Sequence, residues 1–511
     1  MTVFDDELLE KRARLTELLG RPPYPYRFPV TDGLDRLRAR TEELLGSRVA
    51  VAGRVGSIRR MGKARFIDLH DLDGRIQLFC RANEVGERTW AVLDLLDPGD
   101  WLGAEGTLMV TRSGELSVQA AAIEVLAKIT TRVPVAKEKD GQRFSALTDQ
   151  DLKYRKRYLD WATDPAARRR FVLRSRIVQE LRALMHERGF LEVATPTLEP
   201  VYGGADARPF ETAVHALGDQ RVYLRISLEL PLKRYIVGGF PRVFTLGPVF
   251  RNEGIDRFHN PEFTMMEWYE AFTDYTDQME RFEWLVSETA RRVVGTTRIS
   301  YQGRELHLEP PWKRMTVNEA LVEIGGLDVR SASTDELRRL AGDGLTADAA
   351  SDGERTRLRA WAAEASRGAL IMTLFDLRCE EHLVQPTIIK DYPREVSPLT
   401  KRHRDDPDLV ERFEPFICGM EVGNAYSELS DPVEQYERFE EQRGLGSASS
   451  DQDAPDEGHP IDMDFVEAMG CGMPPTGGTG LGVDRLVMLL TDSPSIRDVI
   501  AFPMRRSVPN E

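Results

Sequence analysis

Between residues 48 and 132 the sequence breaks into short runs of β-type residues, and this limits the first part of the chain to few folds. Turn dipeptides such as Asp73-Gly74 and Ser113-Gly114 separate the runs, and one helical stretch, Asn83–Leu95, lies among them. The runs are Val49–Gly53, Arg65–Leu69, Arg75–Phe79, Trp101–Val110 and Leu116–Val125. Five short strands with one intervening helix are typical of a small closed β-barrel, and the OB-fold is the natural candidate.

The residues on either side of this barrel favour helices, and strands return later in the chain. Asp5–Leu19 has leucines at helical spacing among charged residues, so it predicts a short amphipathic helix. Ala166–Arg188 predicts a long helix with one apolar face. Apolar strands are expected at Val222–Ile226, Val243–Pro248 and Glu262–Glu270. We therefore assign the second part of the chain to the α+β class.

Composition suggests where the domains begin and end. We expect an N-terminal helical extension at 1–46, the barrel at 47–135, a polar linker at 136–165 and a larger domain at 166–511. Within the larger domain, the charged, alanine-rich residues 328–366 predict an inserted helical subdomain. Residues 444–458 are rich in Gly, Ser and Asp, which predicts a mobile loop.

Charge and cysteine content exclude several classes of function. Lys and Arg number 69 against 84 Asp and Glu, a net charge of −15, which argues against nucleic-acid binding through a generally basic surface. The 4 cysteines form no C-x-x-C pair, so we expect neither a disulfide scaffold nor zinc. Met1–Gly20 lacks the apolar core of a signal peptide, and no stretch reaches about 18 apolar residues. We expect no membrane span and a cytoplasmic protein.

The usual phosphate-binding loops are missing. The residues from Gly56 to Lys63 miss the P-loop spacing by one position, and Ala64 follows the lysine. Gly477–Gly482 (GGTGLG) does not fit the dinucleotide fingerprint. If the protein binds a nucleotide, arginines on a sheet must contact its phosphates.

Two segments could supply such arginines. Phe250–Gly254 followed by His259–Thr264 predicts a hairpin that presents Arg251 to a phosphate and Phe263 to a base. Gly480–Leu486 predicts a glycine-rich strand followed by an apolar helix that begins near Arg485. Because glycine has no side chain, the backbone of this strand could approach a ligand closely.

These segments resemble motifs 2 and 3 of the class II aminoacyl-tRNA synthetases, and Gly189–Pro196 resembles motif 1. The class I signatures H-I-G-H and K-M-S-K-S are missing. Four further segments are similar to the lysyl-tRNA synthetases of class II. They are Gly203–Phe210, Arg225–Lys233, Cys418–Leu429 and Met473–Pro475.

The resemblance covers the chain from its first helix to its last residues and implies its architecture and partners. It implies a six-stranded antiparallel sheet flanked by helices, and an OB-fold that binds the anticodon of tRNA(Lys). It also implies a homodimer formed through the motif 1 helix. The implied reaction joins L-lysine to ATP as lysyl-AMP, with release of pyrophosphate, and then transfers lysyl to the terminal ribose of tRNA.

The resemblance further implies which residues bind the lysine side chain. Glu229, Glu428 and the hydroxyl of Tyr269 would hold the ε-ammonium, and Tyr426 would pack along the methylene stem. An ammonium in a closed pocket needs carboxylates to offset its lost hydration. These acids argue against an aspartyl enzyme, whose substrate would need a cation at that place.

The resemblance also implies which residues bind the α-amino and carboxylate groups of the amino acid. Glu267 and the backbone of Gly204 match positions that hold the α-amino group. Arg251 and Asn424 match positions that hold the α-carboxylate. The head and the tail of lysine would thus meet different residues of one pocket.

For ATP, the resemblance implies a sandwich of adenine between Phe263 and Arg485. Glu253 would meet the adenine amino group, and His259 and Asn260 would lie near the phosphates and ribose. Because no strong acid or base is needed for in-line attack on the α-phosphorus, positioning and charge would supply most of the catalysis.

Two arginines and two glutamates complete the implied reaction site. Arg251 would contact both the carboxylate and the α-phosphate, and Arg485 the departing pyrophosphate, so both are predicted catalytic residues. Glu414 and Glu421 match the family's Mg²⁺ ligands, and Glu421 would also lie against ATP.

At the barrel, the basic cluster Arg59–Arg65 gives local positive charge. Phe66, Gln77 and Glu115 resemble the residues that recognise the central uracil of the anticodon, and Arg65 of the basic cluster is assigned with them to anticodon binding. Two alternatives stay open at this point. One is a paralogue that attaches lysine to a protein, and the other is a non-catalytic tRNA-binding homologue.

Overall fold

The structure is a computed structural model that describes residues 4–72, 74–134, 137–139, 142–144, 147–347, 349, 351–445 and 460–506. The chain divides into two compact units, Met1–Phe171 and Val172–Glu511. Apart from residues 444 and 445, the predicted mobile loop 444–458 lies outside the described residues. Among the residues described, no helix combines the length and apolar character needed to cross a membrane.

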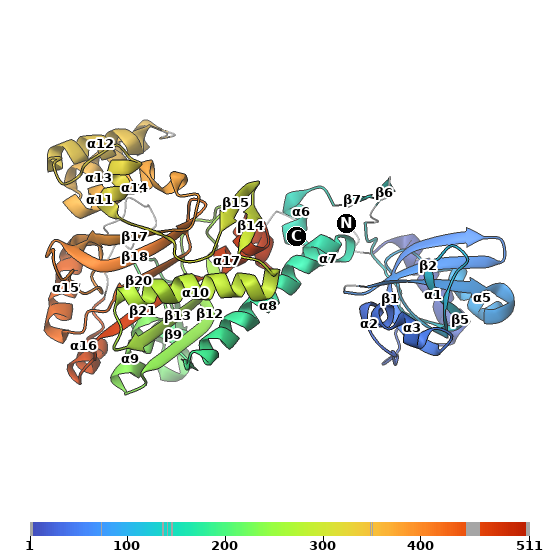
Figure 1. Ribbon diagram of the computed structural model, residues 1–511. Coiled ribbons are helices and arrows are strands. Elements are labelled where there is room, and N and C mark those ends of the chain that lie inside the picture. The colour runs from blue at the N-terminus through green and yellow to red at the C-terminus, as the bar shows by residue number, and fades with distance from the viewer. Residues whose placement is uncertain are drawn as a thin grey trace. The chain divides into compact units, whose positions relative to one another are not determined.

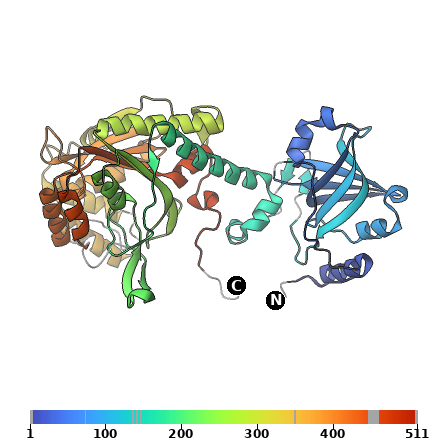
Figure 2. The ribbon, with the colours of Figure 1, turned by 90° about the horizontal axis from the view of Figure 1, so that it is seen from below.

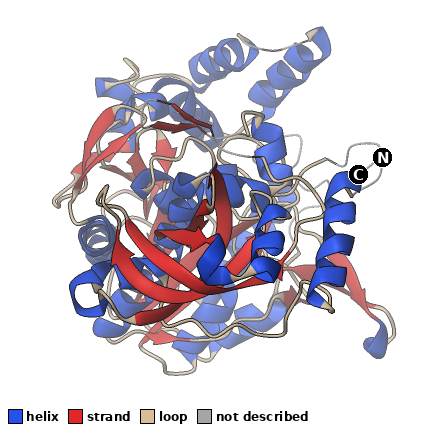
Figure 3. Cartoon of the chain, turned by 90° about the vertical axis from the view of Figure 1, so that its right-hand side faces the viewer, coloured by secondary structure: helices blue, strands red, loops and turns tan. Residues whose placement is uncertain are grey.

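Five strands of the first unit close into a barrel in the order β1-β2-β3-β5-β4, which confirms the predicted OB-fold (Figure 2). They are β1 (Arg48–Met61), β2 (Ala64–His70), β3 (Arg75–Arg81), β4 (Trp101–Val110) and β5 (Leu116–Ala127). Figure 3 shows how strongly these strands curve. Alternate side chains such as Ile67 and Leu69 point inward and are 0% exposed. The predicted helix between β3 and β4 is two helices, because Gly86 (φ 80°) interrupts it.

Helices flank the barrel. Helix α1 (Asp6–Leu19) is capped by the Asp5 side chain, ends at Gly20 (φ 68°) and buries Leu8 and Leu15. The remaining elements of the first unit are short. They are α2 (Leu34–Ala39), α3 (Thr41–Leu44), α4 (Ala82–Val85), α5 (Glu87–Asp94), β6 (Lys137–Lys139), β7 (Gln142–Phe144), α6 (Gln150–Arg155) and α7 (Arg157–Thr163).

The second unit is built on a nine-stranded sheet. Its six central strands are antiparallel, as predicted, and a short parallel strand extends each edge, so the sheet as a whole is mixed. The central strands are β17 (Thr387–Pro393), β18 (Leu409–Ile417), β20 (Gly423–Ser427), β21 (Thr476–Gly482), β13 (Glu262–Ala271) and β12 (Arg242–Phe250). The outer ones are β16 (Lys313–Thr316) and β8 (Leu191–Glu192), and β19 (Met420–Glu421) pairs with β18.

The two faces of this sheet carry different helices. Trp268 and Phe244 pack in one core with α8 (Pro165–Glu187), α10 (Tyr275–Val294) and α17 (Val483–Leu490), and Figure 1 shows α10 lying across the sheet. Their chain neighbours Tyr269 and Val243 pack instead with α9 (Glu229–Val237) and α16 (Met463–Gly470). Because side chains alternate along a strand, the odd-numbered residues of β13 face α9.

A group of helices with its own core adjoins the sheet near β17 (Figure 1). Charged residues 328–366 contribute α12 (Thr334–Thr346) and α13 (Asp352–Glu364) to it, and α14 (Arg367–Arg378) follows directly, beyond the predicted stretch. The remaining elements are β9 (Leu198–Glu199), β10 (Glu211–Val214), β11 (Gln220–Leu224), β14 (Arg298–Tyr301), β15 (Arg304–His307), α11 (Val317–Glu323), α15 (Pro432–Leu445) and α18 (Ile496–Val499). Of these, α11 packs in the core of this helix group, and α18 packs in the core with α17.

Candidate active site

One pocket of about 940 Å³ lies on the sheet face that α9 adjoins. It brings together the site residues predicted for the second unit with one exception, because Glu428 is buried and does not line it. The predicted residues that line the pocket are Gly204, Glu229, Arg251, Glu253, His259, Asn260, Phe263, Glu267, Tyr269, Glu414, Glu421, Asn424, Tyr426 and Arg485.

Glycines of β21 form the floor of this pocket. Strand β21 lies between β13 and β20, and its residues at the pocket include Gly478 and Gly480. The strand register gives two rows of side chains across the floor, Tyr269–Gly478–Tyr426 and Glu267–Gly480–Asn424. A side chain at Gly478 would collide with Tyr269 and Glu428, so only glycine fits there.

Two carboxylates, Glu229 and Glu428, and buried Lys233 lie together at what we call the closed end of the pocket, and of these three only Glu229 lines it. Glu229 begins α9, and Lys233 follows one turn later with a fully buried side chain. Lys233 Nζ lies 2.5 Å from Glu229 Oε1 and 2.5 Å from Glu428 Oε2. Burial raises the pKa of Glu428 to about 8, although the Lys233 ammonium acts in the opposite direction.

A third carboxylate, Glu267, lies in the other row of the floor, opposite Gly480. Its Oε1 accepts a hydrogen bond from the Leu228 backbone at 2.8 Å, and its Oε2 accepts one from the Tyr269 hydroxyl at 3.3 Å. Burial, together with the charge of Glu229, raises the pKa of Glu267 to about 7. This acid therefore changes its charge close to neutral pH.

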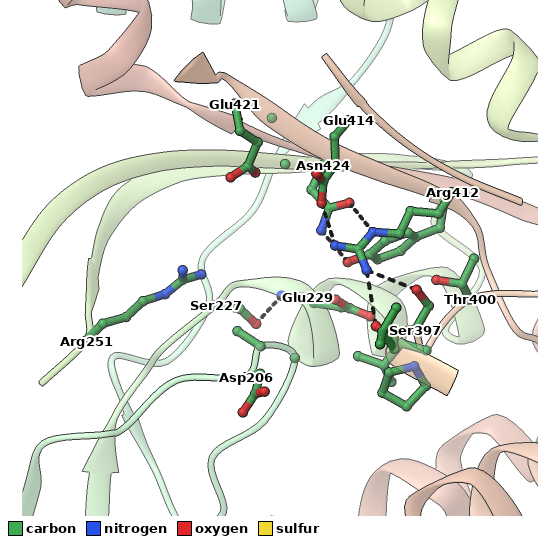
Figure 4. A pocket seen from close by; sticks show the side chains of 18 of the residues that line it. Asp206, Ser227, Glu229, Arg251, Ser397, Thr400, Arg412, Glu414, Glu421 and Asn424 are labelled. Carbon is green, nitrogen blue, oxygen red and sulfur yellow. Dashed lines mark hydrogen bonds and ion pairs between the residues drawn. The ribbon is translucent and has the colours of Figure 1, made fainter. Parts of the chain in front are cut away.

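Arg412 on β18 links two of the predicted residues (Figure 4). Its Nε donates to Asn424 Oδ1 at 3.1 Å, and its Nη2 donates to Glu414 Oε1 at 2.5 Å. Asn424 in turn donates to the Tyr426 hydroxyl at 2.7 Å, and the Tyr392 hydroxyl donates to Glu414 Oε2 at 2.8 Å. The orientations of the amide and the carboxylate are thus fixed before any ligand binds.

Arg251 and Phe263 lie together on the other side of the pocket. The guanidinium carbon of Arg251 is 5.3 Å from the centre of the Phe263 ring, and Figure 4 shows Arg251 well apart from Arg412. Arg251 Nε donates to the Ile226 carbonyl at 3.4 Å. The β12–β13 hairpin therefore presents a cation and an aromatic face side by side, as the sequence predicts.

Arg485, on α17, connects two further predicted residues. Its Nη1 donates to the Glu421 carbonyl at 2.6 Å and lies 3.3 Å from Glu421 Oε2. Its Nη2 is 3.1 Å from His259 Nε2, and His259 Nδ1 is 2.8 Å from Asp256 Oδ2. The chain of contacts runs from the sheet to the loop between β12 and β13.

Two predicted residues of the same loop have local partners. Glu253 Oε1 accepts a hydrogen bond from the Arg208 backbone at 3.3 Å. Asn260 is buried, and its Nδ2 donates to the Glu262 carbonyl at 2.6 Å. Its Oδ1 has no hydrogen-bond partner among the described residues, so it is available to a ligand donor.

Glu414 and Glu421 lie close enough to repel each other. Burial raises the pKa of Glu414, and the charge of Glu421 adds to the rise. Burial also raises the pKa of nearby Glu380 to about 7, with Glu421 and Glu414 contributing. A divalent cation would relieve this repulsion, so the residues fit a Mg²⁺ site. No group of three or more His, Cys, Asp or Glu suited to a metal occurs in the described part of the chain, so an ion held by these two carboxylates would need further oxygens from a ligand.

The barrel carries a ladder of aromatic and basic side chains on its outer face. Phe66 and Phe79 stack with ring centres 5.0 Å apart, and Arg59 and Arg81 lie over their outer sides. Gln77 is two residues from Phe79 on β3 and therefore faces the same way, although it is buried. Such a surface suits stacked bases.

The structure does not bring all four predicted barrel residues together. Glu115 lies just before β5, and one of its oxygens is 4.0 Å from Arg75. Arg65 has the opposite parity to Phe66 on β2, so it points elsewhere. Its guanidinium lies over Trp90 and donates to Asp94 at 3.0 Å.

Family models and known relatives show which family the chain belongs to. The model for tRNA synthetases class II (D, K and N) matches residues 149–506, and the model for the OB-fold nucleic acid binding domain matches residues 49–126. Lysine–tRNA ligase of Moorella thermoacetica is 45% identical over 98% of this chain and 96% of that protein. The chain belongs to the class II lysyl-tRNA synthetase family. Lysine–tRNA ligases of Synechococcus sp. (strain RCC307) and Clostridium acetobutylicum are 45% and 42% identical, over 99% of this chain and 96% and 95% of theirs.

Three residues of the site were not predicted from the sequence, and of these Lys233 and Asp484 are buried and Arg412 is partly buried. Lys233 and Arg412 contact predicted residues directly, and Asp484 joins the motif 2 strand to the motif 3 helix. Only Lys233 left a local signal, since it follows Glu229 by four positions in a helix, where opposite charges pair. Asp484 has partners distant in sequence, Thr264 and Arg174. Arg412 pairs with nearby Glu414, but its contact with Asn424 joins two neighbouring strands.

Proposed function

We infer that the chain is a lysine–tRNA ligase, which forms lysyl-AMP from L-lysine and ATP and then charges tRNA(Lys). The observation that carries this conclusion is the near full-length similarity to lysine–tRNA ligases, at 42–45% identity. The acidic closed end of the pocket supports the choice of amino acid, because two carboxylates there face only one resident cation.

In this proposal lysine lies along the floor of the pocket. Its ε-ammonium meets Glu229, Glu428 and the Tyr269 hydroxyl at the closed end, and its stem packs on Tyr426. The row geometry supports this placement, because Tyr269 and Tyr426 flank Gly478, next to which Glu428 lies. A small residue between the two tyrosines leaves room for a methylene chain.

The head of lysine meets the next row. Glu267 and the Gly204 backbone receive the α-ammonium, while Asn424 and Arg251 receive the carboxylate. Arg412 donates to Asn424 Oδ1 and so fixes the amide orientation, with Nδ2 as the donor group. Ionised Glu267 is the form that binds an ammonium, so lysine affinity is expected to depend on pH near 7.

Catalysis in this proposal is positioning and charge stabilisation. The lysine carboxylate attacks the α-phosphorus of ATP in line, Arg251 contacts both partners, and Arg485 offsets charge on the departing pyrophosphate. Phe263 and Arg485 enclose adenine, and Glu253, His259 and Asn260 contact the rest of ATP. No general base is required, because the nucleophile is already a carboxylate.

Class II synthetases use Mg²⁺ with ATP, and we assign its protein ligands here to Glu414 and Glu421. The ion supplies positive charge against the ATP phosphates. Arg412 and Tyr392 hold Glu414, while Arg485 contacts Glu421, so the two carboxylates are oriented from opposite sides. Glu421 also lies beside ATP in this arrangement.

The barrel is proposed to bind the anticodon. Phe66 stacks on a base, and Gln77 and Glu115 offer polar atoms to base edges. The ladder of Phe66, Phe79 and their arginines supports this role. Arg65 is proposed as a further contact, although its present partners are Trp90 and Asp94.

We also propose a homodimer formed through the motif 1 segment and a cytoplasmic location. Leu191 and Leu198, which are 49% and 46% exposed, would be covered by such an interface. Sedimentation velocity tests the dimer directly, and a monomer at micromolar concentration would contradict it.

Pyrophosphate exchange with each of the twenty amino acids tests the proposed function. We expect exchange to depend strongly on L-lysine and on Mg²⁺, and tRNA(Lys) to accept the lysyl group in a second assay. Exchange with lysine but no charging of tRNA would favour the protein-modifying paralogue. No exchange with any amino acid would favour a non-catalytic homologue.

A further inference from the structure

Lys233 is a cation at the closed end of the pocket, and none of the roles assigned above involves it. Its side chain is 0% exposed, and its ammonium lies 2.5 Å from each member of the acid pair, Glu229 and Glu428. The ring of Phe465 packs 6.0 Å from the ammonium. An ammonium this deeply buried is stable only with compensating carboxylates, and here two carboxylates share one cation.

Lys233 contacts the acid pair from behind. Glu229 lines the pocket, whereas Lys233 does not. Each carboxylate meets Lys233 through one oxygen, Oε1 of Glu229 and Oε2 of Glu428. Glu428 Oε1 is buried next to Gly478 and accepts no hydrogen bond from the described residues. Lys233 thus holds one oxygen of each acid, Glu428 Oε1 has no partner among the described residues, and Glu229 lines the pocket.

The charges near the acid pair do not balance. Lys233 compensates one carboxylate and leaves the other in excess. The other charged groups that act on the pair are Glu267 on β13, which adds to the excess, and Arg412 on β18, which already pairs with Glu414. Tyr269 and Tyr426 contribute hydroxyl groups only. One further cation would therefore complete the site.

We propose that Lys233 is a specificity-determining residue, a permanent counterion that leaves the acid pair room for one more cation, the ε-ammonium of the substrate. This deepens the proposed function and rests on it. Without substrate, a proton takes the place of that cation, because burial raises the pKa of Glu428 to about 8. Lysine displaces the proton, whereas an uncharged tail of the same length cannot.

The variant Lys233→Met tests this role. Loss of the ammonium raises the pKa of the acid pair further, so lysine must displace a more tightly held proton. A rise of one to two pKa units lowers kcat/KM for lysine about 10- to 100-fold at pH 7. The inhibition constant of L-norleucine, which lacks the terminal ammonium, changes by less than about threefold because it displaces no proton. The deficit for lysine relative to the wild type shrinks between pH 7 and pH 9.

Lys313→Met is the matched control, because Lys313 is 58% exposed and pairs with Glu323 far from the pocket lining. Lys313→Met should change neither kcat/KM for lysine nor the inhibition constant of L-norleucine. If Lys233→Met weakens lysine and norleucine equally, with the pH profile of the wild type, Lys233 only supports the fold and the proposal is overturned.

A measurement on the wild type covers the case in which the variant does not fold. Lysine and norleucine share the α-ammonium that meets Glu267, so the difference in their proton release isolates the acid pair. Calorimetry in buffers of different ionisation enthalpy should give a difference close to one proton at pH 7, and no difference overturns the proposal. A failure of the proposed function would appear separately, as a wild type with no lysine-dependent exchange.

Discussion

Asp484 Oδ2 accepts a hydrogen bond from the backbone N–H of Thr264 at 2.6 Å and so joins α17 to β13. Asp484 is buried, and Arg174 of α8 contacts both its carboxylate and the Thr264 hydroxyl. The residue after Asp484 is Arg485. One carboxylate therefore sets where the arginine of motif 3 stands relative to the strand of motif 2.

We expect Asp484→Asn to lower the free energy of unfolding by about 2–4 kcal/mol, because it removes the charge that compensates the partly buried Arg174. The KM for ATP should rise as well, since Arg485 loses its fixed position. Urea denaturation and pyrophosphate exchange measure the two effects. Asp343→Asn, in an exposed pair with Arg339, is the control. An unchanged KM for ATP would separate Asp484 from the nucleotide site.

Gly478→Ala should damage lysine recognition more than ATP binding. The added methyl group collides with Tyr269 and Glu428, which must move away from the floor of the pocket. A displacement of this size is expected to lower kcat/KM for lysine about 100-fold. Gly470→Ala, at the end of α16 with no atom near its Cβ, should have wild-type kinetics. Equal losses for lysine and ATP would contradict the proposed placement of lysine.

Arg251→Ala should lower the rate of adenylate formation by about 10³-fold or more, because the cation proposed to bridge carboxylate and α-phosphate is lost. Single-turnover formation of lysyl-AMP measures this step. Arg298→Ala, at an exposed position of β14, is a suitable control. Near-normal lysine-dependent exchange by Arg251→Ala would refute the assigned role.

Gln77→Ala should separate the two steps of the reaction. Loss of one hydrogen bond to a base is expected to lower kcat/KM for tRNA about tenfold. Pyrophosphate exchange without tRNA should remain at the wild-type rate, since the change lies on the barrel. If exchange falls as much as charging does, the barrel is not a separate anticodon site.

Glu199 on β9 predicts a pH dependence of stability. It is 7% exposed, and burial raises its pKa to about 8, although Arg225 acts in the opposite direction. Because this pKa is above the value in the unfolded chain, the native state loses stability as the pH rises from about 4.5 through 8. Glu199→Gln should therefore raise the free energy of unfolding at pH 9 by roughly 2–4 kcal/mol and leave it unchanged at pH 4.5. Denaturation at both pH values, with the exposed Glu211→Gln as control, checks this.

The sequence predicts best those strands and turns that form through short local patterns of apolar and turn residues. The barrel strands and the β12–β13 hairpin follow from short apolar runs between turn residues, and the structure has both. Boundaries were less certain, because capping and tertiary contacts set them. Gly86 divided the helix predicted at Asn83–Leu95, and α14 extended the helical region past residue 366.

The electrostatic partners of the site could not be predicted in the same way. A lysine on a helix usually reaches solvent, and only the tertiary structure places Lys233 against Glu428 and near Phe465 of α16. Likewise, the contact of Arg412 with Asn424 depends on which strands are neighbours in the sheet. The family resemblance identifies the carboxylates Glu229 and Glu428, but the contact of Lys233 with both of them follows only from the tertiary structure.

The two rows across the glycine floor lie two residues apart along β21. Two residues of strand advance about 7 Å, close to the reach of an extended four-carbon side chain with its terminal amine. In the proposed pocket the spacing of residues along β21 therefore matches the length of the lysine side chain. An amino acid shorter by one methylene, such as ornithine, can be anchored at its head or at its tip, but it cannot span both rows without moving the backbone itself.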